Sequence, residues 1–218
     1  MDNIGLKKYF HGVYDFLPCE DGYMSFSRYS KEQREYLKFN DFFFVRTTFD
    51  GSITLEFTTN ATKFGFEYKI LGVSSKDTFD LYVNGNLFAQ SKVADLAEKG
   101  SLEYLLKSGE KKVTLYFPID ADIAIKNFYS DADISVVEKG KKVLFIGDSI
   151  TQGYGTFETG QTFVNVANRI LNYEILNQGI GGYYFDKNSL MSLEKFTPGK
   201  VVIAMGTNLC WWDDKEKY

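Results

Sequence analysis

Histidine is the residue whose scarcity most restricts the chemistry of this chain, since His11 is the only one among 218 residues. Cysteine is nearly as rare, and Cys19 and Cys210 are too few for a disulfide framework or a cysteine-rich metal site. We therefore expect two free thiols, no metal and no cofactor. No apolar run reaches the roughly 18 residues that cross a membrane, and the N-terminal sequence MDNIGLKKYF lacks the apolar core of a signal peptide.

Basic clusters are also missing from the sequence. The formal net charge is −4, and the lysine pairs at 7–8, 111–112 and 141–142 lie near expected strand starts, where solvated lysines protect a sheet edge. Because binding to nucleic acid needs a basic surface, we expect no nucleic-acid partner, and we expect no membrane partner either. The lack of a signal peptide favours a cytoplasmic location. A secreted protein is the alternative if a leader has been removed.

Aromatic residues, by contrast, are abundant, with 20 Phe and 15 Tyr, and many occur in short runs typical of β-strands. Runs rich in Phe, Tyr, Val and Thr span residues 42–49, 52–59, 63–71, 78–85, 111–119 and 123–130. Aromatic and apolar residues alternate in 63–71, as a half-buried strand requires, and Asn84-Gly85 is a strong hairpin signal. We predict that residues 1–138 form a jelly-roll-like β-sandwich with a short helical insertion at 30–39.

Residues 139–218 follow a different pattern, in which apolar strands alternate with helices. Apolar runs predict strands at 143–148 and 201–206, and a further strand is expected at 174–180. The spacing of apolar residues predicts a helix at 161–172, and a short helix is expected at 188–196. This order is typical of a parallel sheet that is covered on both faces. The polar stretch 138–142 marks the boundary between the two expected domains.

Each of the three expected parallel strands ends in a polar segment. These segments are GDSITQG at 147–153, NQGIGG at 177–182 and GTN at 206–208. In a parallel sheet, functional groups gather outside the carboxyl ends of the strands. Acyl transfer needs a nucleophile and fixed N–H donors where negative charge develops on the carbonyl oxygen. Ser149 would supply a hydroxyl and its own N–H, Gly182 an unshielded N–H, and Asn208 a side-chain amide.

In this order and on these elements, the three segments resemble blocks I, II and III of the SGNH (GDSL-type) hydrolases. The resemblance implies a flavodoxin-like α/β/α fold, with Ser149 as the nucleophile and with Gly182, Asn208 and the Ser149 N–H as the oxyanion hole. Gly181 is the second choice for the glycine donor, and Asp148 becomes a structural residue of the turn. A β-sandwich placed before such a domain resembles the two-domain carbohydrate esterases and related acylhydrolases of this superfamily.

The chain departs from the family pattern in lacking the fourth block, an Asp-x-x-His motif whose His is the general base. The base is therefore not present in the chain as given, and Leu209 follows the third block where Asp is common. His11 could replace the base only if the N-terminal domain folded over the α/β site, and a half-buried or surface imidazole is the structural alternative. Asp213 and Asp214 are poor bases for a serine hydroxyl and are expected in a solvated loop or tail.

The sequence stops ten residues after the third block. We therefore expect the N-terminal part of a longer protein, with an incomplete α/β domain at 139–218. Without a further neighbour, the strand at 201–206 would present open N–H and C=O groups to another chain. A homodimer that completes the sheet is the alternative explanation.

These features together predict a serine ester hydrolase of the SGNH type that deacylates, most simply deacetylates, a small-molecule or oligosaccharide ester through Ser149. A lipase or acylhydrolase acting on a small lipid or another acyl ester is one alternative. A glycan-binding or catalytically inactive fragment is the other, because the base is missing. Aromatic side chains could stack on sugars, although Phe at alternating strand positions is usually part of a core.

Overall fold

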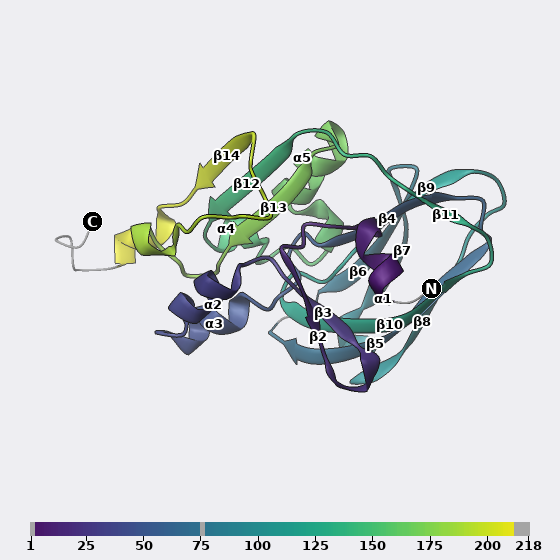
Figure 1. The fold of residues 1–218 in the computed structure, drawn as a ribbon, viewed down its shortest axis with the longest axis horizontal. Helices are drawn as coiled ribbons and strands as arrows, with labels where there is room; N and C mark the ends of the chain where they lie inside the picture. The colour runs from purple at the N-terminus through teal and green to yellow at the C-terminus, as the bar shows by residue number, and fades with distance from the viewer. Residues whose placement is uncertain (1–2, 75–76, 212–218) are drawn as a thin grey trace.

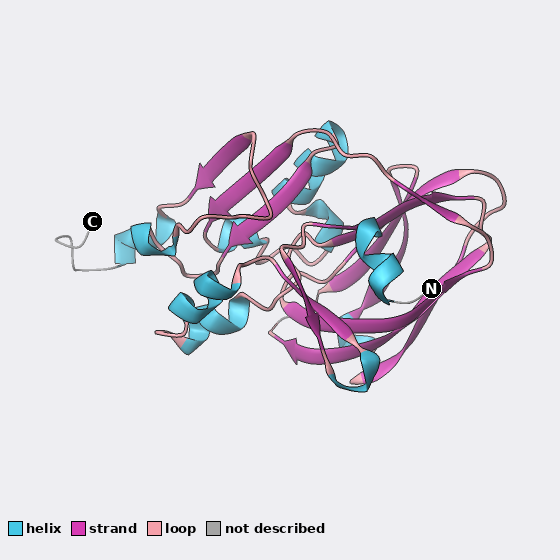
Figure 2. Cartoon of the chain, viewed as in Figure 1, coloured by secondary structure: helices cyan, strands magenta, loops and turns pink. Residues whose placement is uncertain are grey.

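The computed structural model describes residues 3–74 and 77–211 (Figure 1). It is rich in sheet, with two antiparallel sheets formed by the N-terminal residues and one parallel sheet formed by the C-terminal residues (Figure 2). Helices in the described residues are short, and none of them is long and apolar enough to cross a membrane. The fold is therefore of the mixed α/β class that the sequence predicts.

The first antiparallel sheet has six strands. In spatial order they are β1 (Phe10–His11), β4 (Thr54–Thr59), β9 (Lys111–Tyr116), β6 (Thr78–Val83) and β7 (Asn86–Lys92), while β11 (Ile134–Val136) pairs with β4. The predicted hairpin is confirmed between β6 and β7. Asn84 and Gly85 both have positive φ, 51° and 80°, as a two-residue type I′ turn requires.

The second antiparallel sheet has five strands and faces the first. In spatial order they are β2 (Asp15–Pro18), β3 (Met24–Ser27), β10 (Ala121–Ser130), β5 (Lys63–Val73) and β8 (Lys99–Leu105). Strands β2, β3, β7, β8 and β11 have no counterpart among the predicted runs. Each of them contains at most one aromatic residue, and β7 and β8 have several exposed positions.

Aromatic side chains from both antiparallel sheets form one shared core. Phe57 of the first sheet packs edge-on against Phe64 of the second with ring centroids 5.3 Å apart, and Phe66 stacks on Phe117 at 6.3 Å. These four rings are fully buried. The alternation within β5 therefore does turn Phe64 and Phe66 into the core, and the abundance of Phe has a structural explanation.

The predicted helical insertion is confirmed, but the strand predicted at 42–49 is wrong. The N-terminal helices are α1 (Asn3–Leu6), η1 (Lys7–Tyr9), η2 (Glu20–Gly22), α2 (Lys31–Leu37), α3 (Asp41–Arg46) and η3 (Val93–Asp95). Helix α2 begins with a capping box between Ser30 and Gln33. Helix α3 begins because the Asn40 side chain accepts a hydrogen bond from the Phe42 N–H at 2.9 Å, and this cap outweighs the β propensity of the Phe-Phe-Phe-Val run.

The parallel sheet has the strand order β13 (Glu174–Gly179), β12 (Lys142–Gly147), β14 (Lys200–Ala204), which confirms the three expected parallel strands. Its helices are α4 (Ser149–Gln152), η4 (Thr159–Gln161), α5 (Phe163–Leu171), η5 (Lys187–Ser189) and η6 (Thr207–Trp211). The helix predicted at 188–196 is wrong, because only η5 forms there before an irregular segment. Leu193 and Phe196 of that segment still pack on the sheet beside Leu144.

Other elements pack over the central strand β12 of the parallel sheet but leave the edge strand β14 partly exposed. Helix α5 places Val164 against Val143 and Phe145 on one face. On edge strand β14, however, Val201 and Ile203 are 49% and 58% exposed. The expectation of a sheet covered on both faces is therefore wrong for β14.

A buried arginine joins the N-terminal residues to the parallel sheet. Arg28 is fully buried and donates hydrogen bonds to four backbone carbonyls. The acceptors are the carbonyls of Phe49, Arg46, Asn177 and Gly179, of which the last two belong to β13. The two parts of the chain thus form one packed body around this side chain.

Candidate functional site

The turn between β12 and α4 places Ser149 at the start of a helix. Asp148 caps that helix by accepting a hydrogen bond from the Ile150 N–H at 3.0 Å, and Ser149 is partly exposed. A Cβ on Gly147 would lie 1.9 Å from Thr151 Oγ1, so only glycine fits there, and Gly153 ends the helix with a φ of 108°. The turn therefore presents the serine hydroxyl and the Ser149 backbone N–H at the start of a helix.

The loop after β13 brings a second group of backbone donors to the same edge of the sheet. The Gly181 N–H donates to Gln152 Oε1 at 2.6 Å, so this donor is already engaged. Gly182 has a φ of 76°, and among the described residues its N–H has no hydrogen-bond acceptor. Of the two glycines proposed from the sequence for the oxyanion hole, Gly182 is therefore the one whose backbone N–H is free to bind a ligand.

Asn208 lies in η6, directly after β14, and is held to the glycine loop. Its Nδ2 donates to the Tyr183 carbonyl at 2.8 Å. In the parallel register, Gly147 is level with Gly179 on one side and with Ala204 on the other. The segments that follow these three residues therefore share one edge of the sheet, which brings Ser149, Gly182 and Asn208 to the same end of it.

Three charged or polar residues that the sequence did not single out border this edge. Gln152 is buried, and its Nε2 donates to Asp120 Oδ1, so one side chain holds both the Gly181 N–H and a carboxylate from the N-terminal part. Burial, and then the nearby Asp77 carboxylate, raise the pKa of Asp120. Arg46 lies close to Asp120 and Tyr154, and partial burial lowers the pKa of its guanidinium.

Arg46 and Phe42, both from α3, lie against the glycine loop. The Arg46 guanidinium is centred 3.5 Å from the Phe42 ring, and a Cβ on Gly181 would lie 3.0 Å from Arg46 Nε. A Cβ on Gly182 would lie 3.1 Å from Phe42. Sequence reasoning missed both residues because it assigned 42–49 to a strand of the sandwich core. The Asn40 cap before the run is the signal that would have identified the helix.

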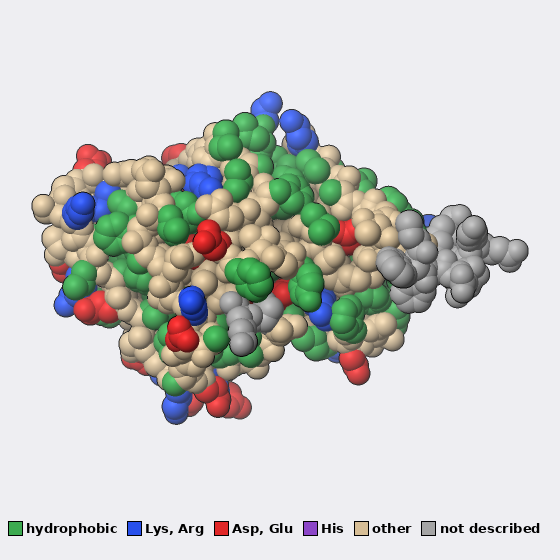
Figure 3. Space-filling view, turned by 180° about the vertical axis from the view of Figure 1, so that it is seen from behind, with side chains coloured by type: hydrophobic (Ala, Val, Ile, Leu, Met, Phe, Trp, Pro, Cys, Tyr) green, Lys and Arg blue, Asp and Glu red, His purple; other side chains and the backbone are tan. Residues whose placement is uncertain are grey.

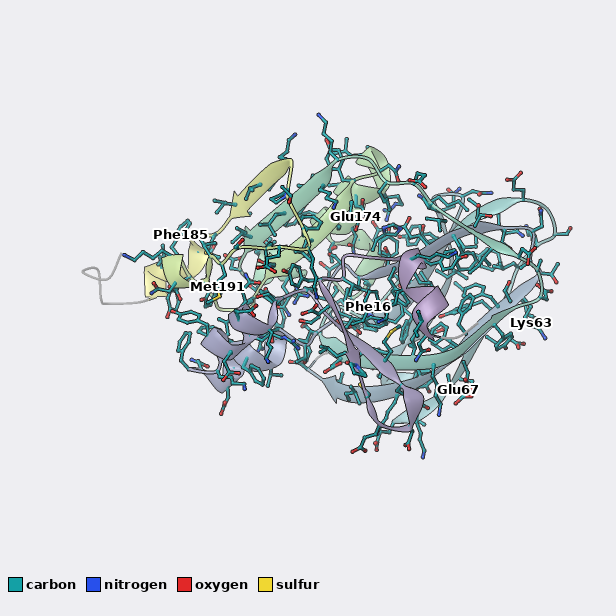
Figure 4. The ribbon with its side chains drawn as sticks, in the orientation of Figure 1. Phe16, Lys63, Glu67, Glu174, Phe185 and Met191 are labelled. Atoms are coloured by element: carbon teal, nitrogen blue, oxygen red, sulfur yellow. The ribbon has the colours of Figure 1, made fainter. Side chains whose placement is uncertain are left out.

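The single histidine lies at the opposite end of the parallel sheet. His11 Nδ1 pairs with the carboxylate of Glu174, the first residue of β13, whereas the glycine loop follows Gly179 at the other end. Five residues of strand separate the two ends, or roughly 17 Å. Figure 4 shows Glu174 near the middle of the molecule and Phe185, beyond the glycine loop, toward the C-terminal end. His11 is thus buried against Glu174 and is not placed to act on Ser149.

The sequence also singled out two cysteines and two aspartates. Cys19 is a free thiol on the N-terminal part. The side chain of Cys210 lies outside the part of the chain that the structure describes, and so do Asp213 and Asp214.

Within residues 3–74 and 77–211, no group of three or more His, Cys, Asp or Glu side chains could hold a metal ion. On the face seen in Figure 3, acidic and basic side chains are interspersed, without a large patch of either sign.

A hollow of about 890 Å³ opens beside the carboxyl ends of β12 and β14. It is lined mainly by apolar and aromatic side chains, among them Tyr36, Phe185, Ile203 and Met205. On one side Asp186 accepts hydrogen bonds from the hydroxyl groups of Tyr36, at 2.7 Å, and Tyr183. Burial raises the pKa of both phenols, so that both remain protonated donors.

Several known structures have a similar fold. The chain is similar in fold to GDSL-like lipases and carbohydrate esterases. A putative GDSL-like lipase from Bacteroides ovatus aligns with 91% of the chain at a TM-score of 0.70 and 18% identity, using 62% of its own length. The salicylyl-acyltransferase SsfX3 from a tetracycline biosynthetic pathway aligns with 79% at a TM-score of 0.68 and 18% identity, using 52% of its length. A family two carbohydrate esterase from Cellvibrio japonicus aligns with 93% at 0.60 and 12% identity, using 66% of its length.

The chain spans about half to two thirds of the length of these structural neighbours. No protein-family model matches the sequence, and no curated protein matches it. The similarity therefore concerns the fold, and the chemistry of the site has to be argued from its own residues.

Proposed function

We propose that this chain carries the Ser-Gly-Asn part of an SGNH-type ester hydrolase, with Ser149 as its nucleophile. The observation that carries the proposal is the common edge at which Ser149, the free Gly182 N–H and Asn208 meet. The resemblance of the three segments to the SGNH blocks supports the same assignment. So do the structural neighbours, which include a putative GDSL-like lipase, an acetyl xylan esterase and family two carbohydrate esterases.

In the proposed reaction, Ser149 Oγ attacks the acyl carbon of an ester, and a base takes its proton. The N–H groups of Ser149 and Gly182 and the second Nδ2 hydrogen of Asn208 stabilise the oxyanion. Gly181 is not used, because its N–H is engaged with Gln152. The alcohol leaves, and water then releases the acyl group from Ser149. The base comes from outside the described residues, since His11 lies at the far end of the sheet.

We propose a carbohydrate ester as the substrate, with deacetylation as the simplest reaction. We interpret residues 1–138, with their two facing antiparallel sheets, as a β-sandwich domain attached to an incomplete flavodoxin-like SGNH domain at 139–218. Exposed aromatic side chains near the edge support a sugar substrate, since Phe42 and Tyr154 are 51% and 60% exposed. The apolar hollow favours, as the second candidate, a longer acyl ester such as a small lipid.

The open edge of β14 is where a further strand would add to the parallel sheet. We propose that this strand comes from a continuation of the polypeptide or from a second copy of the chain. Light scattering over a range of concentrations separates the two, because only a second copy makes the mass depend on concentration.

Chemical rescue tests the proposed reaction. An acetylated xylo-oligosaccharide is incubated with the wild type and with Ser149→Ala, with and without imidazole as an external base. We expect acetate release that requires Ser149 and that imidazole increases in the wild type alone, because imidazole can take the serine proton. Equal rates in the two proteins under both conditions would overturn the proposal and favour a binding or inactive fragment.

A further inference from the structure

Arg46 is placed at the glycine loop by a helix of the N-terminal part. It is the last residue of α3, and its guanidinium lies between the Phe42 ring, 3.5 Å away, and the backbone of Gly181. Asp120 and Tyr154 are near enough to raise its pKa, and the Tyr154 N–H donates to the Ser149 carbonyl. The guanidinium is therefore bordered by both loops that form the proposed catalytic edge.

Within the described part of the chain, most of the N–H donors of Arg46 have no hydrogen-bond acceptor. A guanidinium has five N–H groups, and one of them is accounted for by the bond from Nη1 to the Phe42 carbonyl at 2.8 Å. No carboxylate of the described residues lies within 4.0 Å of the guanidinium, although the charge of Asp120 is near enough to raise the pKa of Arg46. Capping the last turn of α3 explains the bond to Phe42 but leaves the other donors without a role.

The surroundings hold the guanidinium in a fixed orientation. Stacking on Phe42 fixes the plane of the group, and contact with Gly181 leaves no room for a side chain between it and the loop. A planar guanidinium with free parallel donors matches the two oxygens of a carboxylate better than any neutral group does. Asp120 raises the pKa of Arg46 but forms no ion pair with it within 4.0 Å, so the guanidinium is not held in a salt bridge by this carboxylate.

We infer that Arg46 binds the carboxylate of an acidic substrate, so that the ester cleaved at Ser149 belongs to an acylated, uronic-acid-containing carbohydrate. This inference rests on the proposed function for the position of the reacting ester. Phe42, half exposed beside Gly182, supplies a ring face for the same sugar. In this arrangement the N-terminal part of the chain provides specificity for an acidic substrate through Arg46, and the C-terminal part cleaves the ester through Ser149.

Binding of two sugars in the Ser149→Ala background tests the inference without any turnover. Methyl glucuronide and methyl glucoside differ in a carboxylate and are titrated separately by calorimetry. We expect the glucuronide to bind on the order of tenfold more tightly, as a charge-assisted pair provides. Adding Arg46→Gln should abolish the difference, and Arg46→Lys should retain part of it because the charge remains without the fork.

Lys63→Gln is the matched control, because Lys63 is also an exposed cation but lies at the far end of the molecule in Figure 4. It should leave the preference for the glucuronide unchanged. Equal affinities for the two sugars, absence of binding by both, or a preference that survives Arg46→Gln in a protein with an unchanged melting temperature would overturn the inference. Failure of the proposed function would appear elsewhere, as acetate release that does not depend on Ser149.

Discussion

The side chain of Gln152 offers the sharpest test of how the proposed catalytic edge is held together. It is buried, accepts the Gly181 N–H at 2.6 Å, and donates to the Asp120 carboxylate. Gln152→Leu removes both bonds while conserving most of the volume. A buried group that loses its partner costs about 2 kcal/mol, so we expect a loss of about 4 kcal/mol in the free energy of unfolding.

Gln152→Glu separates the two bonds, since a carboxylate still accepts from Gly181 but can no longer donate to Asp120. Two buried carboxylates in contact share a proton, which raises their pKa above that of the unfolded chain. The folded state then binds the proton more tightly, so the destabilisation is small near pH 4 and grows as the pH rises to the raised pKa of the pair. Above that pKa it stays constant.

Urea unfolding of both variants between pH 4 and pH 8 measures these effects. Gln161→Leu is the control, because Gln161 is exposed and bonds only to the neutral Tyr82 hydroxyl, so a change below about 1 kcal/mol is expected. The reasoning fails if Gln152→Leu is as stable as the wild type. It also fails if Gln152→Glu is destabilised equally at every pH.

Three further changes address other parts of the molecule. Arg28→Met removes the charged donor from four carbonyls, although the Gly179 carbonyl keeps the bond from the Tyr29 hydroxyl at 3.3 Å, and it should cost about 3–5 kcal/mol in urea unfolding. Burial raises the pKa of Asp122 to about 6, so its contribution to stability falls as the pH rises from about 4 to about 6. Asp122→Asn should remove that fall and stabilise the protein at pH 7 by about 2 kcal/mol, visible as a higher melting temperature. Asn208→Ala should lower the Ser149-dependent rate by about 10²-fold with little change in KM, measured on the acetylated oligosaccharide.

Much of the fold follows from local patterns in the sequence. The alternation in 63–71, the Asn84-Gly85 turn and the apolar strands before the polar segments all report burial within one element, and the structure confirms them. The run at 42–49 misled because aromatic residues favour strands, whereas the Asn40 cap and contact with the glycine loop select a helix. The helix expected at 188–196 is also absent, because Leu193 and Phe196 pack on the parallel sheet from an irregular segment.

The candidate site was predictable only where it is continuous in the sequence. Ser149, Gly182 and Asn208 each follow a strand, so their common edge follows from the parallel order of the sheet. Arg46 and Asp120 come from distant segments, and nothing in their own neighbourhoods indicates that α3 and the turn before β10 approach this edge. The engagement of Gly181 by Gln152 likewise depends on three-dimensional contact.

The position of Arg28 has a consequence for exchanging parts between proteins of this shape. The sequence pattern changes at 138–142, but the chain is not separable there, since the Asn177 and Gly179 carbonyls depend on a cation supplied by β3 and its following loop. Residues 139–218 produced alone would carry those carbonyls, just before the glycine loop, without a donor. An N-terminal part grafted from another protein would need to bring its own buried cation to this point, or the loop that holds Gly182 would lose its anchor.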